Sequence, residues 1–290
     1  DLKSIVAYAK RRHIEVMPEI DLPGHSVAII ASYPEFNCFP KKLEVRTIPG
    51  VSKDLMCAGN KNVYKFYEDI LAEVAAIFPC KTIHLGGDEA PLDHWKKCPK
   101  CQKTMKKEKL ANTHKLMAHF FSKINQILVK HGKVPMLWFE EGDHSYPKNS
   151  AVVMWRPGSS RRVLQKSYDR GLKLVVAPDS NCYFDYPQTA KDKKSAPGWM
   201  PVTTLRKTYQ LDPGFGVPAK KQSHVIGVEG TLWGEQMKTL NKIVYMAFPR
   251  AMALSEAGWS EMKNRSWEKF EKKLPQHIQR LNKQGFETTR

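Results

Sequence analysis

The sequence predicts an α/β fold on parallel strands, and it favours a (β/α)8 barrel over a doubly wound sheet. Two observations predict the α/β class: short apolar runs alternate with helical stretches, and each run is apolar throughout, as in strands buried on both faces. A third observation favours the barrel, because polar, acidic and aromatic residues follow nearly every run. In (β/α)8 barrels, that end of the strands carries the active site.

Six apolar runs of strand length are predicted to be strands. They are residues 14–20, 82–86, 134–139, 151–155, 172–177 and 225–230. Helices are predicted over residues 2–12, 62–78, 110–131, 161–170, 240–257 and 267–284. The helix over 62–78 is predicted because apolar residues recur at helical spacing from Val63 to Ile77. Pro79 then ends the helix. No repeat or linker is visible, so residues 1–290 are predicted to form a single domain.

The composition argues against several classes of protein. The net charge of +18 is spread over scattered lysines, without an arginine-rich stripe or a nucleic-acid motif, so no nucleic-acid partner is expected. No apolar run approaches the roughly 18 residues of a membrane span. Residues 214–219 match the dinucleotide pattern GxGxxA, but they follow Pro213 rather than a strand, so no nucleotide cofactor is expected.

The six cysteines are too few for a disulfide scaffold in 290 residues. Cys98 and Cys101 form a single CxxC, and a structural zinc site needs two more ligands at suitable spacing. A disulfide or two free thiols are therefore favoured over zinc, and no metal site is predicted.

Two adjacent carboxylates, Asp88 and Glu89, stand in the stretch HLGGDEA at the end of the run 82–86. Acids also follow other runs: Glu140 and Glu141, Asp185, and Glu235. Three tryptophans near the strand ends, Trp138, Trp155 and Trp233, are typical of walls around a sugar or its substituent. An acid with a second carboxylate beside it is a glycosidase pattern. Neighbouring side chains at a strand end point in different directions, so one of the two acids must act as something other than a nucleophile.

The stretch His84-Leu-Gly-Gly-Asp88-Glu89 resembles the signature of glycoside hydrolase family 20, the β-N-acetylhexosaminidases. The match runs from Pro18-Glu-Ile-Asp21-Leu-Pro-Gly-His25 to Leu232-Trp233-Gly-Glu235 and Leu254-Ser-Glu256. The resemblance implies a (β/α)8 barrel that removes terminal β-linked GlcNAc or GalNAc from glycans without a cofactor. It also implies substrate-assisted retaining catalysis, in which the 2-acetamido group attacks the anomeric carbon to give an oxazolinium intermediate.

The resemblance implies a role for each candidate residue. Glu89 would be the general acid and later the base, Asp88 would orient the acetamido group, and His25 would tune the acid. Tyr183 would hydrogen-bond the acetamido oxygen. Trp138, Trp155 and Trp233 would enclose the acetamido methyl and the sugar face, and Asp185 and Glu235 would bind sugar hydroxyls.

The resemblance also implies a departure at the start of the chain. The helix over 2–12 matches the helix before the third barrel strand, so two βα units are expected from a longer chain or another segment. Two alternatives stay open: a disaccharide-releasing enzyme of the same family, and a catalytically impaired glycan-binding remnant. Relatives are commonly secreted, periplasmic or lysosomal, and in such a compartment Cys38 and Cys57 are expected to form a disulfide.

Overall fold

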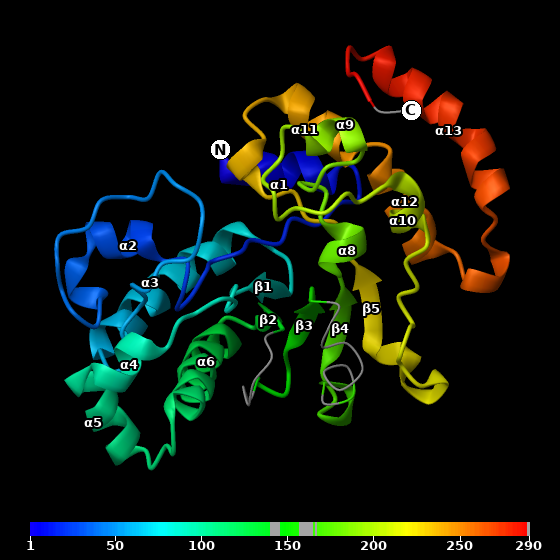
Figure 1. The fold of residues 1–290 in the computed structure, drawn as a ribbon. Helices are drawn as coiled ribbons and strands as arrows, with labels where there is room; N and C mark the ends of the chain where they lie inside the picture. The colour runs from blue at the N-terminus through cyan, green and yellow to red at the C-terminus, as the bar shows by residue number, and fades with distance from the viewer. Residues whose placement is uncertain (140–145, 157–164, 166, 289–290) are drawn as a thin grey trace. The chain divides into compact units, whose positions relative to one another are not determined.

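The computed structural model describes residues 1–139, 146–156, 165 and 167–288. The chain divides into two compact units, Asp1–Val152 and Val153–Arg290, and short strands and helices alternate within each (Figure 1). The acids Glu140 and Glu141 and half of the helix predicted over 161–170 lie outside the described residues. The single domain over 1–290 stays a prediction.

The first unit holds two paired strands and the helices around them. Its helices are α1 (Leu2–Lys10), α2 (Val27–Ser32), α3 (Lys61–Ile77), α4 (Asp93–Lys97), α5 (Pro99–Lys107) and α6 (Thr113–Lys130), with a 3₁₀ turn, η1, at Pro34–Phe36. Its strands are β1 (Thr82–His84) and β2 (Val134–Trp138), and β3 (Ala151–Met154) begins at its end. Helices α1, α3 and α6 confirm three predicted helices, whereas the short helices α2, α4 and α5 were not predicted.

Helix α3 forms because its apolar stripe and its cap agree. Val63, Tyr67 and Leu71 follow at intervals of four and are buried on one face. The side chain of Asn60 accepts a hydrogen bond from the backbone N–H of Asn62 and so satisfies a free donor of the first turn. Helix α6 packs against α3, so the two helices share the core of this unit.

Strands β1 and β2 pair in parallel, with Thr82 opposite Val134. The strand predicted over 14–20 is reduced to a bridge between Glu19 and His84 of β1. Pro18 has no N–H to donate, which keeps this ladder short. The segment still runs parallel to β1, so all three segments deliver their carboxyl ends to the same edge.

The second unit also pairs two strands in parallel. Its strands are the end of β3, β4 (Lys173–Val176) and β5 (Val225–Val228), and Leu174 lies opposite Val225. Its helices are α8 (Asp179–Cys182), α9 (Ala190–Lys193), α10 (Leu205–Tyr209), α11 (Leu240–Ala247), α12 (Arg250–Trp259) and α13 (Trp267–Asn282), with 3₁₀ turns η3 (Ala219–His224), η4 (Gly234–Gln236) and η5 (Met262–Asn264). The helix predicted over 240–257 is divided into α11 and α12, because Pro249 cannot donate a helical hydrogen bond.

A separate core fixes α13 in the second unit. Tyr209 of α10, Ala253 of α12, and Phe270 and Leu274 of α13 are buried against one another. The rings of Tyr209 and Phe270 lie 4.9 Å apart. Burying these large apolar side chains is what orders the last helix on its unit.

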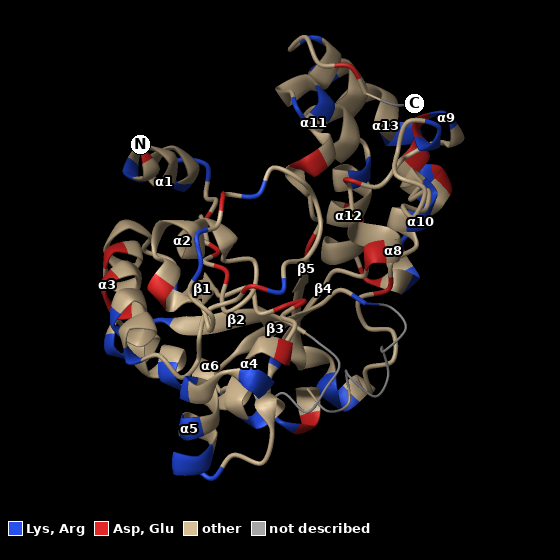
Figure 2. Cartoon of the chain, turned by 60° about the vertical axis from the view of Figure 1, so that its left-hand side comes forward, with Lys and Arg blue, Asp and Glu red and all other residues tan. Residues whose placement is uncertain are grey.

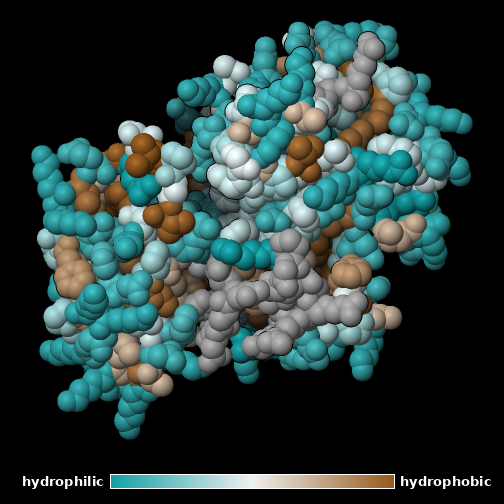
Figure 3. All heavy atoms as spheres, in the orientation of Figure 1, coloured by the Kyte–Doolittle hydropathy of each residue, from teal (hydrophilic) through white to brown (hydrophobic). Residues whose placement is uncertain are grey.

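Basic residues are distributed over many elements, including α1, α5 and α11 (Figure 2). The face in Figure 3 is largely hydrophilic, with hydrophobic residues scattered over it. Both views fit the scattered lysines of the sequence. Within the described ranges, no helix combines the length and apolar character needed to cross a membrane.

All six cysteines are buried free thiols, so the disulfide predicted between Cys38 and Cys57 is not formed. Cys57 instead lies 3.7 Å, sulfur to sulfur, from both Cys98 and Cys101. The sequence alone does not reveal this arrangement, because Cys57 lies in the loop before α3 and Cys98 and Cys101 lie at the start of α5.

Candidate active site

Three parallel segments of the first unit bring polar side chains together. The N–H of Leu85 donates to the carbonyl of Met136 (2.8 Å), and its carbonyl accepts from the N–H of Leu22 (3.1 Å). The chain after β1 therefore lies between the segment that carries Asp21 and the segment that ends in Trp138. The first two segments continue from their strand ends into loops with candidate residues, and the third ends in Trp138, as the sequence predicted for a barrel.

Gly86 makes the exit from β1 possible. Its φ is +61°, a left-handed conformation that side chains other than glycine rarely adopt. A Cβ atom at this position would lie 1.5 Å from Oδ1 of Asp21. Any larger residue would therefore push Asp21 out of place, which explains the glycine two positions before Asp88.

His25 lies between the two adjacent acids. Its Nε2 is 3.6 Å from Oδ2 of Asp88 and 3.7 Å from Oε2 of Glu89, distances of ion pairs rather than of short hydrogen bonds. The contacts with Asp88 and then Glu89 raise the pKa of His25 to about 10, although burial opposes this. His25 and Glu89 also have φ values of +48° and +46°. Such strained backbone is concentrated at functional sites.

Two further acids lie behind this group. Burial, together with the charges of Asp88 and Glu19, raises the pKa of Asp21 to about 7. Burial opposes ionisation of Glu19 too, but hydrogen bonds with His84 and Trp138 lower its pKa. The indole N–H of Trp138 donates to Oε1 of Glu19 (2.8 Å). Trp138 is thus placed by Glu19, a contact that sequence reasoning missed although Glu19 belongs to the matched motif.

A cavity of about 340 Å³ adjoins Glu89 in the first unit. Its lining includes Gly87 and Glu89, Lys96 of α4, and His114 and Met117 of α6. The Glu89 side chain is 35% exposed, against 13% for Asp88. Glu89 is therefore the more accessible of the two acids.

The second unit gathers the aromatic candidates. Tyr183 forms a parallel bridge with Thr231, which brings it close to Trp233. The ring of Tyr183 lies 6.3 Å from Trp155 in a stacked arrangement and 6.1 Å from Trp233. Tyr183 forms a buried cluster with Tyr186 and Met200, and Trp155 and Trp233 are partly buried against it. Trp138, the third predicted wall, belongs to the first unit.

Asp185 and Glu235 are close enough to interact. Burial raises the pKa of Asp185 to about 7, and the charge of Glu235 adds to the rise. Glu235 is exposed on η4. Within the described part of the chain, Oδ1 of Asp185 and Nε1 of Trp155 are buried without a hydrogen-bond partner. Buried polar groups ordinarily have partners, so these two atoms are suited to a polar ligand.

Arg250 supports this loop and was missed by sequence reasoning. It is fully buried, and burial lowers its pKa to about 9. Its guanidinium donates to the carbonyls of Phe184 (2.6 Å), Tyr186 (2.9 Å) and Thr203 (3.0 Å). The only hint in the sequence is an arginine within the apolar stretch Phe248-Pro-Arg-Ala-Met. Arg250 holds the backbone on both sides of Asp185.

Two groups in the described residues have enough donor atoms close together to hold a metal ion. One is His25 with Asp88 and Glu89, and the other is Cys38, Cys57, Cys98 and Cys101. The first group mixes an imidazole with two carboxylates, a set that serves proton transfer as well as it serves a metal.

Comparison with known proteins identifies the family. Residues 1–262 match the model of the glycosyl hydrolase family 20 catalytic domain. The chain is 44% identical over 280 residues to a beta-hexosaminidase of Akkermansia muciniphila and 33% identical over 289 residues to one of Porphyromonas gingivalis. The matches cover 96% and 98% of this chain but 56% and 36% of those relatives.

Solved structures agree. A crystal structure of a beta-N-acetylhexosaminidase matches with a TM-score of 0.92 and 43% identity, covering 97% of this chain and 60% of the other. The exo beta-N-acetylglucosaminidase of Vibrio harveyi, solved with N-acetylglucosamine, matches with a TM-score of 0.86 and 29% identity, over 100% of this chain and 45% of the other. The chain thus spans about half the length of several relatives. It belongs to glycosyl hydrolase family 20, whose catalytic domains are (β/α)8 barrels, and its parallel strands and helices have the α/β character of that fold.

Proposed function

We propose that the protein is an exo-acting β-N-acetylhexosaminidase that removes terminal β-linked GlcNAc or GalNAc by substrate-assisted catalysis. One observation carries the proposal: the adjacent acids Asp88 and Glu89 both contact His25, in a chain that belongs to family 20. The names of its relatives support the same activity.

Glu89 is the proton donor in this proposal. It gives its proton to the glycosidic oxygen while the acetamido oxygen of the substrate attacks the anomeric carbon. In the second step its carboxylate takes a proton from the water that opens the oxazolinium ring. The greater exposure of Glu89 and the cavity beside it support this role.

Asp88 has a different task. The carboxylate of Asp88 is mostly buried. It accepts a hydrogen bond from the acetamido N–H and so aligns the attacking oxygen, and it balances the positive charge of the oxazolinium ring that forms. The positive φ of Glu89 turns the chain sharply between the two acids, which allows neighbouring residues to act differently.

The residues of the second unit bind the sugar in this proposal. Tyr183 hydrogen-bonds the acetamido oxygen, and Trp155 and Trp233 hold the acetamido methyl. Trp138 keeps its proposed role as a further wall for the sugar. Asp185 and Glu235 accept sugar hydroxyls. The stacking of Tyr183 on Trp155 and the unpartnered Oδ1 of Asp185 support these assignments.

The test compares Glu89→Gln with the parent in the full-length protein, on two substrates. One is an aryl β-N-acetylglucosaminide with a good leaving group, and the other is chitobiose. Loss of a general acid costs about 10² to 10⁴ in rate, and the loss should be larger for chitobiose, whose leaving oxygen needs the proton more. Equal losses of rate on both substrates, or a rate within a few-fold of the parent, would show that Glu89 is not the proton donor.

We also propose an exported or lysosomal location, on the strength of the family alone. Fractionation of the native cells, with detection of the full-length protein by antibody, tests it. Recovery only with cytosolic markers would contradict the proposal.

A further inference from the structure

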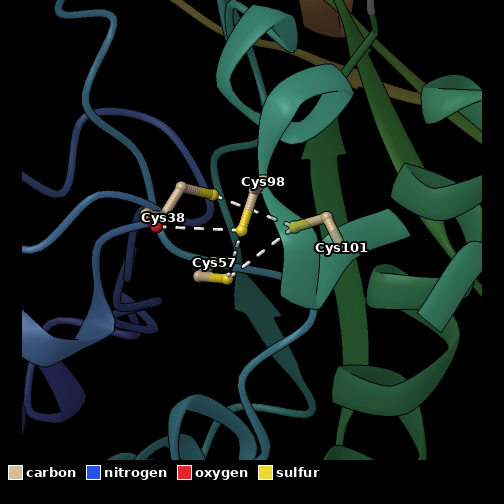
Figure 4. Close-up of side chains that lie close together, drawn as sticks. All are labelled: Cys38, Cys57, Cys98 and Cys101. Atoms are coloured by element: carbon tan, nitrogen blue, oxygen red, sulfur yellow. Dashed lines mark hydrogen bonds between the residues drawn. The ribbon is translucent and has the colours of Figure 1, made fainter. Parts of the chain in front are cut away.

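Four of the six cysteines converge at one buried point in the first unit. Cys38 and Cys57 come from the two ends of the loop before α3, Cys98 precedes α5, and Cys101 lies in its first turn. At most 5% of any of these four residues is exposed. Figure 4 shows their sulfur atoms pointing toward a common centre. The remaining two, Cys80 and Cys182, lie outside this group.

The sulfur positions have the dimensions of a tetrahedral zinc site. A Zn–S bond of about 2.3 Å places the sulfurs of a tetrahedron about 3.8 Å apart. Here Cys38 and Cys101 are 3.8 Å apart, and Cys57 is 3.7 Å from both Cys98 and Cys101. All four sulfur atoms lie within 4.8 Å of one another. Disulfide sulfurs are only about 2.05 Å apart, so the cluster is not a pair of bridges.

The surroundings favour a metal held by four thiolates. Zinc with four thiolates carries a net charge of −2, which positive neighbours stabilise. Residues 96–107, which contribute two of the ligands, contain six lysines and no acid. The segment carries Lys96, Lys97, Lys100, Lys103, Lys106 and Lys107. Soft sulfur ligands in tetrahedral geometry select zinc or iron among the common metals.

We propose that Cys38, Cys57, Cys98 and Cys101 bind one structural zinc ion, each thiol losing its proton on binding. A site with four protein ligands leaves no position for substrate, so the ion stabilises the fold rather than taking part in the reaction. It also explains how buried thiols stay reduced, because thiolates bound to zinc are withdrawn from disulfide formation.

The site joins two separate segments of the first unit, the loop 38–57 and the start of α5. The loop 38–57 has little regular structure, and its base is closed by a single antiparallel bridge between Asn37 and Met56. Gly59, two residues after Cys57, packs closely against α5, because a Cβ at Gly59 would lie 2.2 Å from the backbone of Lys100. The zinc ion would clamp this loop to the start of α5.

Hydrogen bonds of Met56, the residue before Cys57, connect the clamp to the segments that carry His25 and Glu89. The N–H of Met56, next to Cys57, donates to the carbonyl of Pro23 (2.9 Å), two residues before His25. The indole N–H of Trp95 donates to the carbonyl of Met56 (3.0 Å), and Trp95 belongs to α4, soon after Glu89. Any effect of zinc loss on hydrolysis rests on the proposed function, whereas the proposal that zinc binds at the four cysteines does not.

The decisive experiment measures zinc in the full-length protein, purified without metal-affinity steps and dialysed against a chelator. Elemental mass spectrometry gives the zinc content per chain of the parent, of Cys57→Ser and of the control Cys80→Ser. Cys80 is also a buried thiol of the first unit, and it donates to the carbonyl of Thr82 instead. We expect Cys57→Ser to lose one zinc per chain and to melt several degrees lower, and Cys80→Ser to keep its zinc.

If Cys57→Ser does not fold, the parent decides. Titration of its thiols with an organomercurial should release zinc in proportion to the thiols modified. Equal zinc in parent and Cys57→Ser, iron in place of zinc, thiol modification without zinc release, or disulfides at these cysteines would each overturn the proposal. None of these readouts depends on hydrolysis, so failure of the zinc site and failure of the proposed function are distinguishable.

Discussion

Replacing Gly86 by alanine tests whether the exit from β1 is set by contact with Asp21. The chain offers a matched control in Gly132, whose φ of +68° is close to the +61° of Gly86. A Cβ at Gly132 would meet no atom within 4 Å, whereas one at Gly86 would lie 1.5 Å from Oδ1 and 2.6 Å from Cγ of Asp21. The two substitutions therefore differ mainly in the steric contact.

The expected magnitudes follow from these distances. A left-handed conformation costs a residue with a Cβ about 1 to 2 kcal/mol, and the smaller entropy of the unfolded alanine chain offsets about 0.4 to 1 kcal/mol of this. Gly132→Ala should therefore lower the free energy of unfolding by roughly 1 kcal/mol. Gly86→Ala adds the cost of overpacking, typically about 1 to 3 kcal/mol. It should also lower the rate of hydrolysis, because Asp88 and Glu89 follow Gly86 after a single residue, Gly87.

The assay is urea unfolding of the full-length protein, with kcat measured on an aryl N-acetylglucosaminide. A double-mutant cycle with Asp21→Ala isolates the steric contact, since that change removes both clashing atoms. The cost of Gly86→Ala should fall in the Asp21→Ala background toward that of Gly132→Ala. Equal costs for Gly86→Ala and Gly132→Ala in the parent would refute the reasoning.

Three further substitutions have defined outcomes. Because Asp21 has a pKa of about 7 in the fold against an ordinary 3.8, the folded state binds its proton more tightly, and the parent loses stability as pH rises between these values. Asp21→Asn should therefore gain stability relative to the parent across this window, by at most about 4 kcal/mol; a melting-temperature difference that is flat with pH would contradict this. Arg250→Lys cannot reach the same carbonyls, so it should lower the free energy of unfolding by about 2 to 4 kcal/mol. It should also raise KM more than it lowers kcat. Melting followed by circular dichroism and steady-state kinetics check both effects, and an unchanged melting temperature would contradict the first. Tyr183→Phe should lower kcat by about 10-fold or more, as loss of one hydrogen bond to the reacting group does, while melting stays near the parent; an unchanged kcat would remove Tyr183 from the chemistry.

The long helices and the site motif were predictable because their signals are local. Helix α3 carries its apolar stripe and its cap within its own sequence, and α13 likewise matches the helix predicted over 267–284. The acid pair was recognisable from the residues around Asp88. In each case the information lies within a few neighbouring residues, which a reading of sequence periodicity can capture.

The features that were missed depend on contacts between distant segments. Helices α4 and α5 are short, and α4 is held by the bond from Trp95 to Met56 rather than by a long apolar stripe. The raised pKa of Asp21 comes from burial against segments far along the chain. Arg250 binds carbonyls of a loop that precedes it by many residues. The four cysteines likewise meet only after the loop 38–57 folds onto α5.

The role of the acetamido group is tested most directly by substrates that differ in that group alone. The measurement is kcat/KM of the full-length protein for 4-nitrophenyl β-N-acetylglucosaminide and for the matching β-glucoside. An intramolecular nucleophile in the right geometry supplies several kcal/mol of the barrier, about 7 to 11 in the best cases. We therefore predict a preference of at least about 10³-fold for the N-acetylated substrate, reduced sharply in Asp88→Asn. Comparable rates on the two substrates, or a sugar trapped covalently on a carboxylate of the protein, would contradict substrate-assisted catalysis.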